Sequence, residues 1–155
     1  MGTATAKSDG KRQQPYRLRR PACADEWEVY HRIRRDVLLE SQKYALEHAD
    51  ETAPDHHPLL LWLEDRPIGS IRIDRVDAMN AALRLVAIDP GWQSQGHGRA
   101  LLQLAEEFAR EQGCAKAVVY ATPDAAAFYG KAGYVEDDWD EAYVSGIVQM
   151  LKPLG

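Results

Sequence analysis

A glycine-rich turn is the sequence feature that most limits how this chain can fold. Residues 83–88 read as a strand and a helical pattern begins at about residue 98, so the turn at residues 91–98 joins a strand directly to a helix N-terminus. Free backbone N–H groups and the positive end of the helix dipole favour phosphate oxygens at such a place. Gly96 and Gly98 lack a Cβ and permit close approach to the main chain, and Arg99 offers charge-assisted hydrogen bonds. The turn therefore predicts a phosphate site.

The sequence of this turn does not match two well-known phosphate-binding motifs. A dinucleotide-binding fingerprint requires a third glycine where this chain has Leu101. A P-loop requires Lys where this chain has His97, although Gly91 and Gly96 have its spacing. A turn whose glycines serve backbone conformation alone remains the plainer interpretation.

Periodicity along the rest of the chain predicts alternating strands and helices. Short links between the early strands predict an antiparallel meander, and the polar, proline-containing residues 47–58 predict a loop. Residues 1–14 lack periodicity and are expected to form a mobile tail, which leaves residues 15–155 as a single domain. The expected strands are residues 16–20, 59–64, 68–76, 82–88, 117–120 and 144–151, and the expected helices are residues 25–44, 98–112 and 123–132.

Composition excludes several classes of protein. The chain has 155 residues, and its longest purely apolar run, Leu59–Leu63, is far too short for a membrane span. A formal charge of −5 argues against a general nucleic-acid binder and is compatible with a cationic small substrate. Two cysteines, Cys23 and Cys114, are expected to be reduced thiols, and residues 1–20 contain no secretory apolar block, so we expect a cytoplasmic protein.

Two motifs together resemble a known enzyme family. The first is Gln-Ser-Gln-Gly-His-Gly at residues 93–98, between a strand and an amphipathic helix. The second is Phe-Tyr-Gly-Lys-Ala-Gly-Tyr at residues 128–134, where a short helix ends. Over about residues 16–152, the chain resembles the GCN5-related N-acetyltransferases (GNAT) in both motifs and in the order of its elements.

The resemblance implies a GNAT-type acyl-CoA N-acyltransferase fold of the α/β class. In this fold, a mixed central sheet is flanked by helices in α-β-α layers and opens between the strand at Val86 and the strand at Val118 to receive the coenzyme. It implies acetyl-CoA as cosubstrate, direct transfer to a primary amine of a small molecule or peptide, and no metal. Tyr129 would be the catalytic acid beside the thioester sulfur. The coenzyme-binding residues would be Val86, Ala87 and Ile88 along the pantetheine arm, Gln93, Ser94, Gln95, Gly96, His97, Gly98 and Arg99 at the pyrophosphate, and Lys131.

The chemical requirements of acetyl transfer agree with the roles expected for Tyr129 and Ile88. The reaction needs a neutral amine, a polarised thioester carbonyl and a proton for the departing thiolate. A phenol is protonated at neutral pH, which makes Tyr129 a suitable acid, and the backbone N–H of Ile88 is a candidate to polarise the carbonyl. The strand at residues 83–88 lacks the Glu that relatives often carry, so Asp74, Asp89 and an ordered water remain candidates for the base.

Departures from the family also leave other functions open. Tyr120 and Thr122 stand where many relatives have an Asn that assists binding. A CoA-binding sensor or interaction module without catalysis is therefore the alternative function. The expected strand at residues 144–151 would be an exposed edge, which is a possible homodimer contact.

Two clusters of polar residues allow both a functional and a plainer interpretation. His48, Asp50, Asp55, His56 and His57 crowd one expected loop, where solvated side chains or a border of the acceptor site are favoured over a metal site. Residues 136–141 are acidic around Trp139. This segment is either a solvated turn or a negative wall that attracts a protonated amine, with Trp139 offering a cation–π face.

Overall fold

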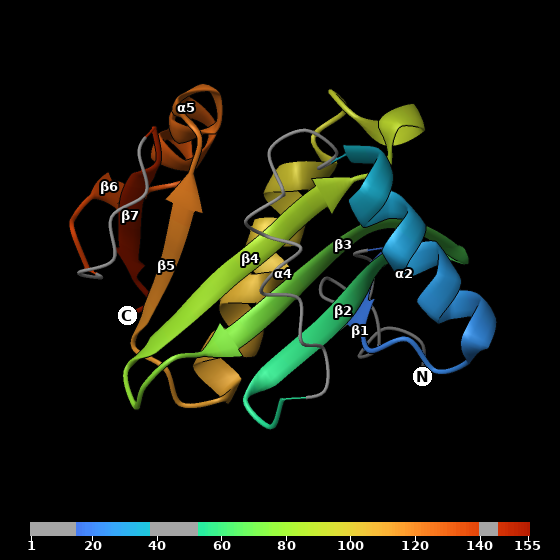
Figure 1. The fold of residues 1–155 in the computed structure, drawn as a ribbon, viewed down its shortest axis with the longest axis horizontal. Coiled ribbons are helices and arrows are strands. Elements are labelled where there is room, and N and C mark those ends of the chain that lie inside the picture. Colours follow the sequence, from blue (N-terminus) through green and yellow to red (C-terminus); the bar gives the residue numbers. More distant parts are fainter. Residues whose placement is uncertain (1–14, 38–52, 140–145) are drawn as a thin grey trace, which may run out of the picture.

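The computed structural model describes residues 15–37, 53–139 and 146–155. Within them, seven strands form one sheet in the order β1-β2-β3-β4-β5-β7-β6 (Figure 1). The elements are β1 (Tyr16–Arg19), α2 (Ala24–Val37), β2 (His56–Leu63), β3 (Arg66–Arg75), β4 (Asn80–Ile88), the short 3-10 helix η1 (Pro90–Trp92), α4 (His97–Glu111), β5 (Lys116–Ala121), α5 (Pro123–Lys131), β6 (Val135–Glu136) and β7 (Val148–Pro153). No helix among these residues is long and apolar enough to cross a membrane.

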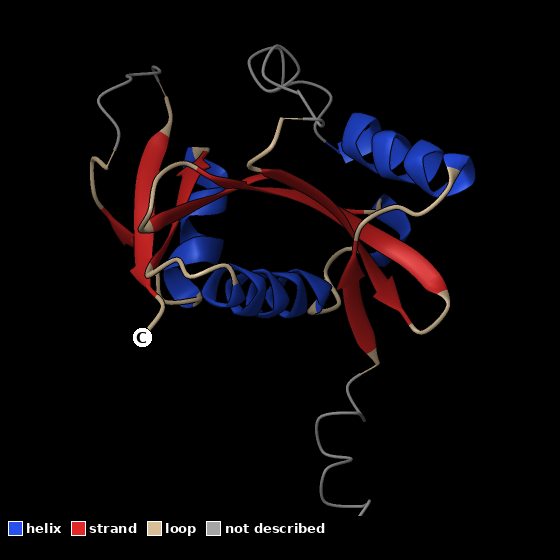
Figure 2. Ribbon diagram, turned by 90° about the horizontal axis from the view of Figure 1, so that it is seen from below, coloured by secondary structure: helices blue, strands red, loops and turns tan. Residues whose placement is uncertain are grey.

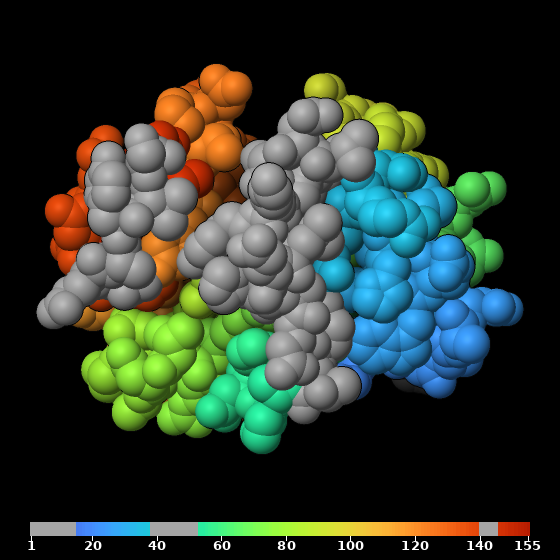
Figure 3. All heavy atoms as spheres, in the orientation of Figure 1, coloured from blue at the N-terminus to red at the C-terminus, as the bar shows by residue number. Residues whose placement is uncertain are grey.

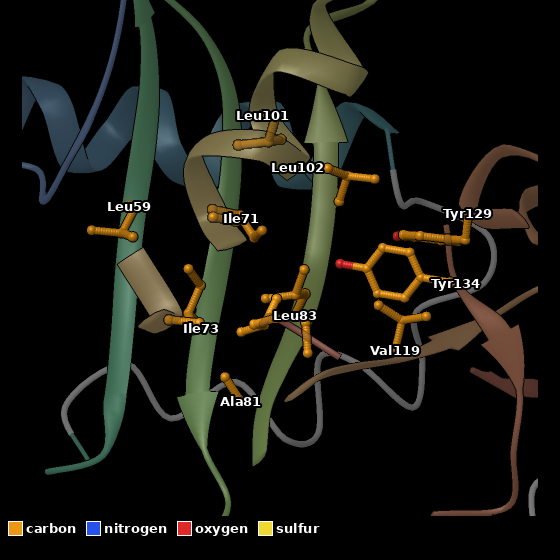
Figure 4. Close-up of a cluster of buried hydrophobic side chains, with 14 of the residues drawn as sticks. Leu59, Ile71, Ile73, Ala81, Leu83, Leu101, Leu102, Val119, Tyr129 and Tyr134 are labelled. Atoms are coloured by element: carbon orange, nitrogen blue, oxygen red, sulfur yellow. The ribbon is translucent and has the colours of Figure 1, made fainter. Parts of the chain in front are cut away.

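Helices cover both faces of the sheet because its central strands are apolar on both sides. In Figure 2, α2 lies on one face and α4 on the other. Under α2, Leu60 and Ala87 pack with Tyr30 and Ile33. On the α4 face, a larger core joins residues of the strands to residues of α4 and α5, among them Leu59, Leu61, Ile71, Ile73, Leu83, Leu101, Leu102, Val119 and Tyr129 (Figure 4). This arrangement confirms the expected α-β-α layers.

The sheet is mixed, and its one parallel pairing is very short. Strands β1 to β4 form an antiparallel meander, as their short links predict. Strand β4 runs parallel to β5 and pairs with it at residues 80–82, opposite residues 116–118. Both strands lie wholly within the described residues, and from residue 83 onward β4 has no partner in β5. The expected opening of the sheet on the Val86 side of β4 is therefore present.

An irregularity in β4 lies next to this opening. The register between β3 and β4 shifts between Ser70 and Arg72, and Leu85 has a left-handed φ of 58°. Such a bulge bends a strand and changes which side chains face each side of the sheet. A Cβ at Gly69 would lie 3.0 Å from the carbonyl oxygen of Ala87, so glycine permits β3 to approach β4 closely at this point.

Two expectations about the early part of the chain need correction. Strand β2 begins at His56, so the end of the expected loop at residues 47–58 is strand. His56 and His57 consequently point to opposite faces: His56 lies 3.5 Å from Asp74 of β3, whereas the ring of His57 contacts Phe108 of α4. The histidine cluster is therefore divided by the sheet. His48, Asp50 and residues 38–44 of the expected helix lie outside the described residues.

The last expected strand also differs from the structure. Strand β7 covers residues 148–153 and pairs with β5 on one side and with β6 on the other. It is not an edge strand, which removes the reason for placing a homodimer contact there. The two-residue strand β6, which the sequence analysis did not predict, forms the edge instead.

We expect that replacing Gly69 will loosen the packing of β3 against β4. Gly69→Ala places a methyl group 3.0 Å from a backbone oxygen, and overpacking of this kind costs about 1–3 kcal/mol. Urea denaturation would measure the loss. Gly91→Ala is the matched control because its Cβ would meet no atom within 4 Å. Equal stability of the two variants would contradict the close approach.

Candidate active site

The turn between β4 and α4 is held by its own side chains. The Gln93 amide donates from Nε2 to the carbonyl of Ile88 at 2.9 Å, and Gln95 Nε2 donates to the carbonyl of Gly91 at 3.3 Å. Ser94 and Gly96 adopt left-handed φ values of 62° and 88°. The two glutamines thus fix the path of the backbone in this turn.

The first turn of α4 is open to an anion. Its N-cap is Gly96, which offers no side-chain acceptor to the N–H groups of the helix. Residues 93–96 and the side chain of Arg99 are exposed. Uncapped N–H groups, the helix dipole and a cationic side chain therefore face solvent together, as a phosphate site requires.

His97 departs from the expected set of coenzyme contacts. Its side chain is buried, and the hydroxyl of Tyr16 on β1 lies 2.8 Å from its Nδ1. The ring of Trp92 also contacts it, with centroids 5.7 Å apart. The His97 side chain thus anchors the turn to β1 and the core, which leaves its backbone N–H as its candidate contact with a phosphate.

The two sequence motifs meet in space. A Cβ at Gly98 would lie 3.1 Å from the ring of Phe128 on α5, so glycine allows the two helices to approach each other. Helix α5 begins at Thr122, whose hydroxyl accepts a hydrogen bond from the N–H of Ala125 at 3.3 Å, and it ends at the exposed Lys131. Figure 3 shows α5, in orange, and the turn after β4, in yellow, both at the upper edge of the molecule.

Tyr129 is the buried residue of α5 and lies in the apolar core. Its side chain is 6% exposed and packs edge-on against Tyr134, with ring centroids 5.6 Å apart. Figure 4 shows the two phenol oxygens directed to the same side. Burial raises the pKa of Tyr129 to about 12, because the apolar environment disfavours the phenolate. The phenol therefore keeps its proton throughout the neutral range, as an acid catalyst must.

A buried carboxylate beside these rings escaped the sequence analysis. Glu106 of α4 is 5% exposed; it accepts a hydrogen bond from the Tyr134 hydroxyl at 2.8 Å and one from Lys152 Nζ at 3.0 Å. Burial and the adjacent Glu106 carboxylate raise the pKa of Tyr134. The signal available in the sequence was the position of Glu106 one helical turn after the core residue Leu102.

Both candidate side-chain bases are held by arginines. Asp89 Oδ2 accepts a hydrogen bond from Arg32 of α2 at 3.2 Å, and Asp74 accepts two from Arg72. Each candidate base is therefore already engaged with a cationic side chain. In the described part of the chain, no group of three or more His, Cys, Asp or Glu side chains is arranged to hold a metal.

An aromatic and cationic surface lies across the opening between β4 and β5. Trp139 donates from Nε1 to the carbonyl of Val119 at 3.4 Å, and its ring lies 4.9 Å from that of Tyr120. The guanidinium of Arg84 lies 5.4 Å from the Tyr120 ring centroid. Trp139 is thus packed on β5, while residues 140 and 141 of the acidic segment lie outside the described residues.

Comparison with known proteins identifies the class to which this fold and site belong. Residues 17–134 match the family model described as the acetyltransferase (GNAT) family. The chain is 32% identical over 91 residues to GCN5-related N-acetyltransferase 1, chloroplastic, of Arabidopsis thaliana, a match that covers 56% of this chain and 46% of that protein. It spans about half the length of the curated relatives that it matches.

Solved structures share the fold. An acyl-CoA N-acyltransferase from Pseudomonas aeruginosa has a TM-score of 0.71 at 19% identity, covering 88% of this chain and 97% of that one. The ribosomal-protein-S18-alanine N-acetyltransferase from Escherichia coli has a TM-score of 0.66 at 18% identity, covering 90% of this chain and 94% of that one. The chain belongs to the GNAT acetyltransferase family.

The burial of Tyr129 predicts a loss of stability in alkali. Its pKa is about 12 in the folded protein against an ordinary value of 10.0, so its stabilising effect is complete below pH 10 and is lost as the pH rises toward 12. Chemical denaturation at a series of pH values should show this decline. Tyr129→Phe should reduce its steepness, and parallel curves for the two proteins would contradict the prediction.

Proposed function

We propose that the protein transfers an acetyl group from acetyl-CoA directly to a primary amine of a small molecule or peptide. The observation that carries the proposal is the free edge of β4 at residues 83–88, which leads into an uncapped helix N-terminus. An extended pantetheine arm can pair with such an edge as an added strand, with its pyrophosphate on the first turn of α4. Residues 86–88 supply the edge, and residues 93–99 supply the phosphate site.

Tyr129 supplies the proton in this proposal. The amine nitrogen attacks the thioester carbonyl carbon, the C–S bond breaks as the amide forms, and the thiolate sulfur takes the phenol proton. A backbone N–H of residues 86–88 polarises the carbonyl oxygen. Because arginines hold Asp74 and Asp89, the amine proton leaves through water rather than to either carboxylate.

Calorimetric titration of the purified chain with acetyl-CoA tests the binding half of the proposal, with ATP and NAD as controls. We expect selective binding of acetyl-CoA, because the turn lacks the lysine of a P-loop and the third glycine of a dinucleotide fingerprint. Equal or tighter binding of ATP or NAD would overturn it. Selective binding without transfer to any amine would favour a CoA-binding sensor or interaction module on the same fold.

Tyr129→Phe tests the catalytic half. We expect turnover to fall by about 10²-fold or more, the usual contribution of a positioned acid, with little change in the dissociation constant for acetyl-CoA. Thiol release measures turnover, and calorimetry measures binding. A fully active Tyr129→Phe variant would remove Tyr129 from the chemistry.

A further inference from the structure

Three charged residues form a compact cluster on the α2 face of the sheet. Arg72 of β3 donates from Nε and Nη2 to the two carboxylate oxygens of Asp74, both at 2.8 Å. Arg84 of β4 pairs in register with Arg72, and its Nε lies 2.8 Å from Asp74 Oδ2. That last contact is an ion pair without hydrogen-bond alignment. Two guanidinium groups thus share one carboxylate.

The cluster carries an excess of positive charge in a buried place. Among the described residues, Asp74 is the one carboxylate within ion-pair distance of either guanidinium. Arg72 is 2% exposed, and its Nη1 is buried with no hydrogen-bond partner. The hydroxyl of Ser70, two residues earlier on β3, is also buried without a partner. A buried cation with an unpaired donor is costly, and an added anion would offset that cost.

Arg84 is the member of the cluster that a ligand can reach. Its side chain is 23% exposed, compared with 4% for that of Asp74. Asp74 holds the Nε side of the guanidinium, and the Tyr120 ring lies 5.4 Å from it. Within the described part of the chain, its two terminal nitrogens have no hydrogen bond or ion pair. Because the guanidinium is already held in place, its two terminal nitrogens can bind a carboxylate with little further loss of conformational entropy.

Arg84 lies close to the strand segment that is proposed to bind the coenzyme. Arg84 lies two residues before Val86 on the same strand, next to the bulge at Leu85 and at the free edge of β4. An anionic group held by Arg84 would therefore lie beside the segment proposed to carry the pantetheine arm. In an α-amino acid the amine is one carbon from the carboxylate, so an amine held through its carboxylate at Arg84 would lie beside the same segment.

We propose that the acceptor is an amine that carries a carboxylate, of the α-amino acid class, and that Arg84 binds this carboxylate. The inference rests on the proposed acetyl transfer and specifies its substrate class. Arg84 sets specificity and takes no part in the chemical step. Arg72 and Asp74 are positioning residues, because they hold the Arg84 guanidinium and leave the cluster with a net positive charge.

Matched pairs of acceptors test the proposal. Each proteinogenic α-amino acid that has a single primary amine is compared with the amine that lacks its carboxylate, such as phenylalanine with phenethylamine, by thiol release from acetyl-CoA. For the best acceptor we expect kcat/KM to be about ten- to a hundredfold higher with the carboxylate present, because removing it leaves the guanidinium unpaired. Equal or better transfer to the decarboxylated amines would overturn the proposal.

Variants of Arg84 test which residue is responsible. Arg84→Met should raise KM for the amino acid by about tenfold or more and abolish the preference over the matched amine. Arg84→Lys should restore part of the preference, because lysine keeps the positive charge but lacks the paired terminal nitrogens of the guanidinium. Arg66→Met, at the exposed start of β3, removes the same charge elsewhere and should behave as wild type. A preference retained in Arg84→Met would overturn the assignment.

A binding measurement separates this inference from the proposed transfer. N-acetylglycine and N-methylacetamide, which differ by the carboxylate, are titrated into the wild type and Arg84→Met in the presence of CoA. Carboxylate-dependent binding that is lost in Arg84→Met supports the inference even where turnover is absent. Selective acetyl-CoA binding with no such dependence overturns the inference and leaves the transfer standing, whereas no acetyl-CoA binding counts against the transfer itself.

Discussion

The short parallel contact between β4 and β5 is the constraint on which the rest of this structure depends. The two strands pair at residues 80–82 and 116–118 and then separate, so β4 keeps a row of backbone groups without a partner in β5. An unpaired strand edge inside a sheet is costly unless another group pairs with it. The separation also lets α5, which follows β5, stand across from the turn that follows β4.

Packing around the opening holds the start of α4, helix α5 and Tyr129 in place. Gly98 allows α4 to reach Phe128 of α5, and the Tyr16 hydroxyl with His97 ties the start of α4 to β1. Behind them, Glu106 holds Tyr134, whose ring supports Tyr129. The candidate acid is thus positioned by a buried polar network, and its apolar environment raises its pKa and keeps it protonated.

The two faces of the sheet carry different parts of the proposed reaction. The α4 face holds Tyr129 within the apolar core. The α2 face carries Arg72, Asp74 and Arg84, where two cations share one carboxylate. Acetyl transfer in general needs a protonated acid and a held thioester, whereas the choice of acceptor needs a feature particular to this chain. The charge imbalance on the α2 face is such a feature.

The sequence alone determined the elements and the family. Apolar periodicity placed most helices and strands, and the motifs at residues 93–98 and 128–134 identified the resemblance, because turn and cap residues act locally. Only the tertiary structure decided that His97 is buried, that His56 and His57 face opposite sides, and that Glu106 and Asp74 lie in networks. These facts depend on contacts between side chains that are distant in the sequence. Strand register and the bulge at Leu85 determine which of these side chains are in contact.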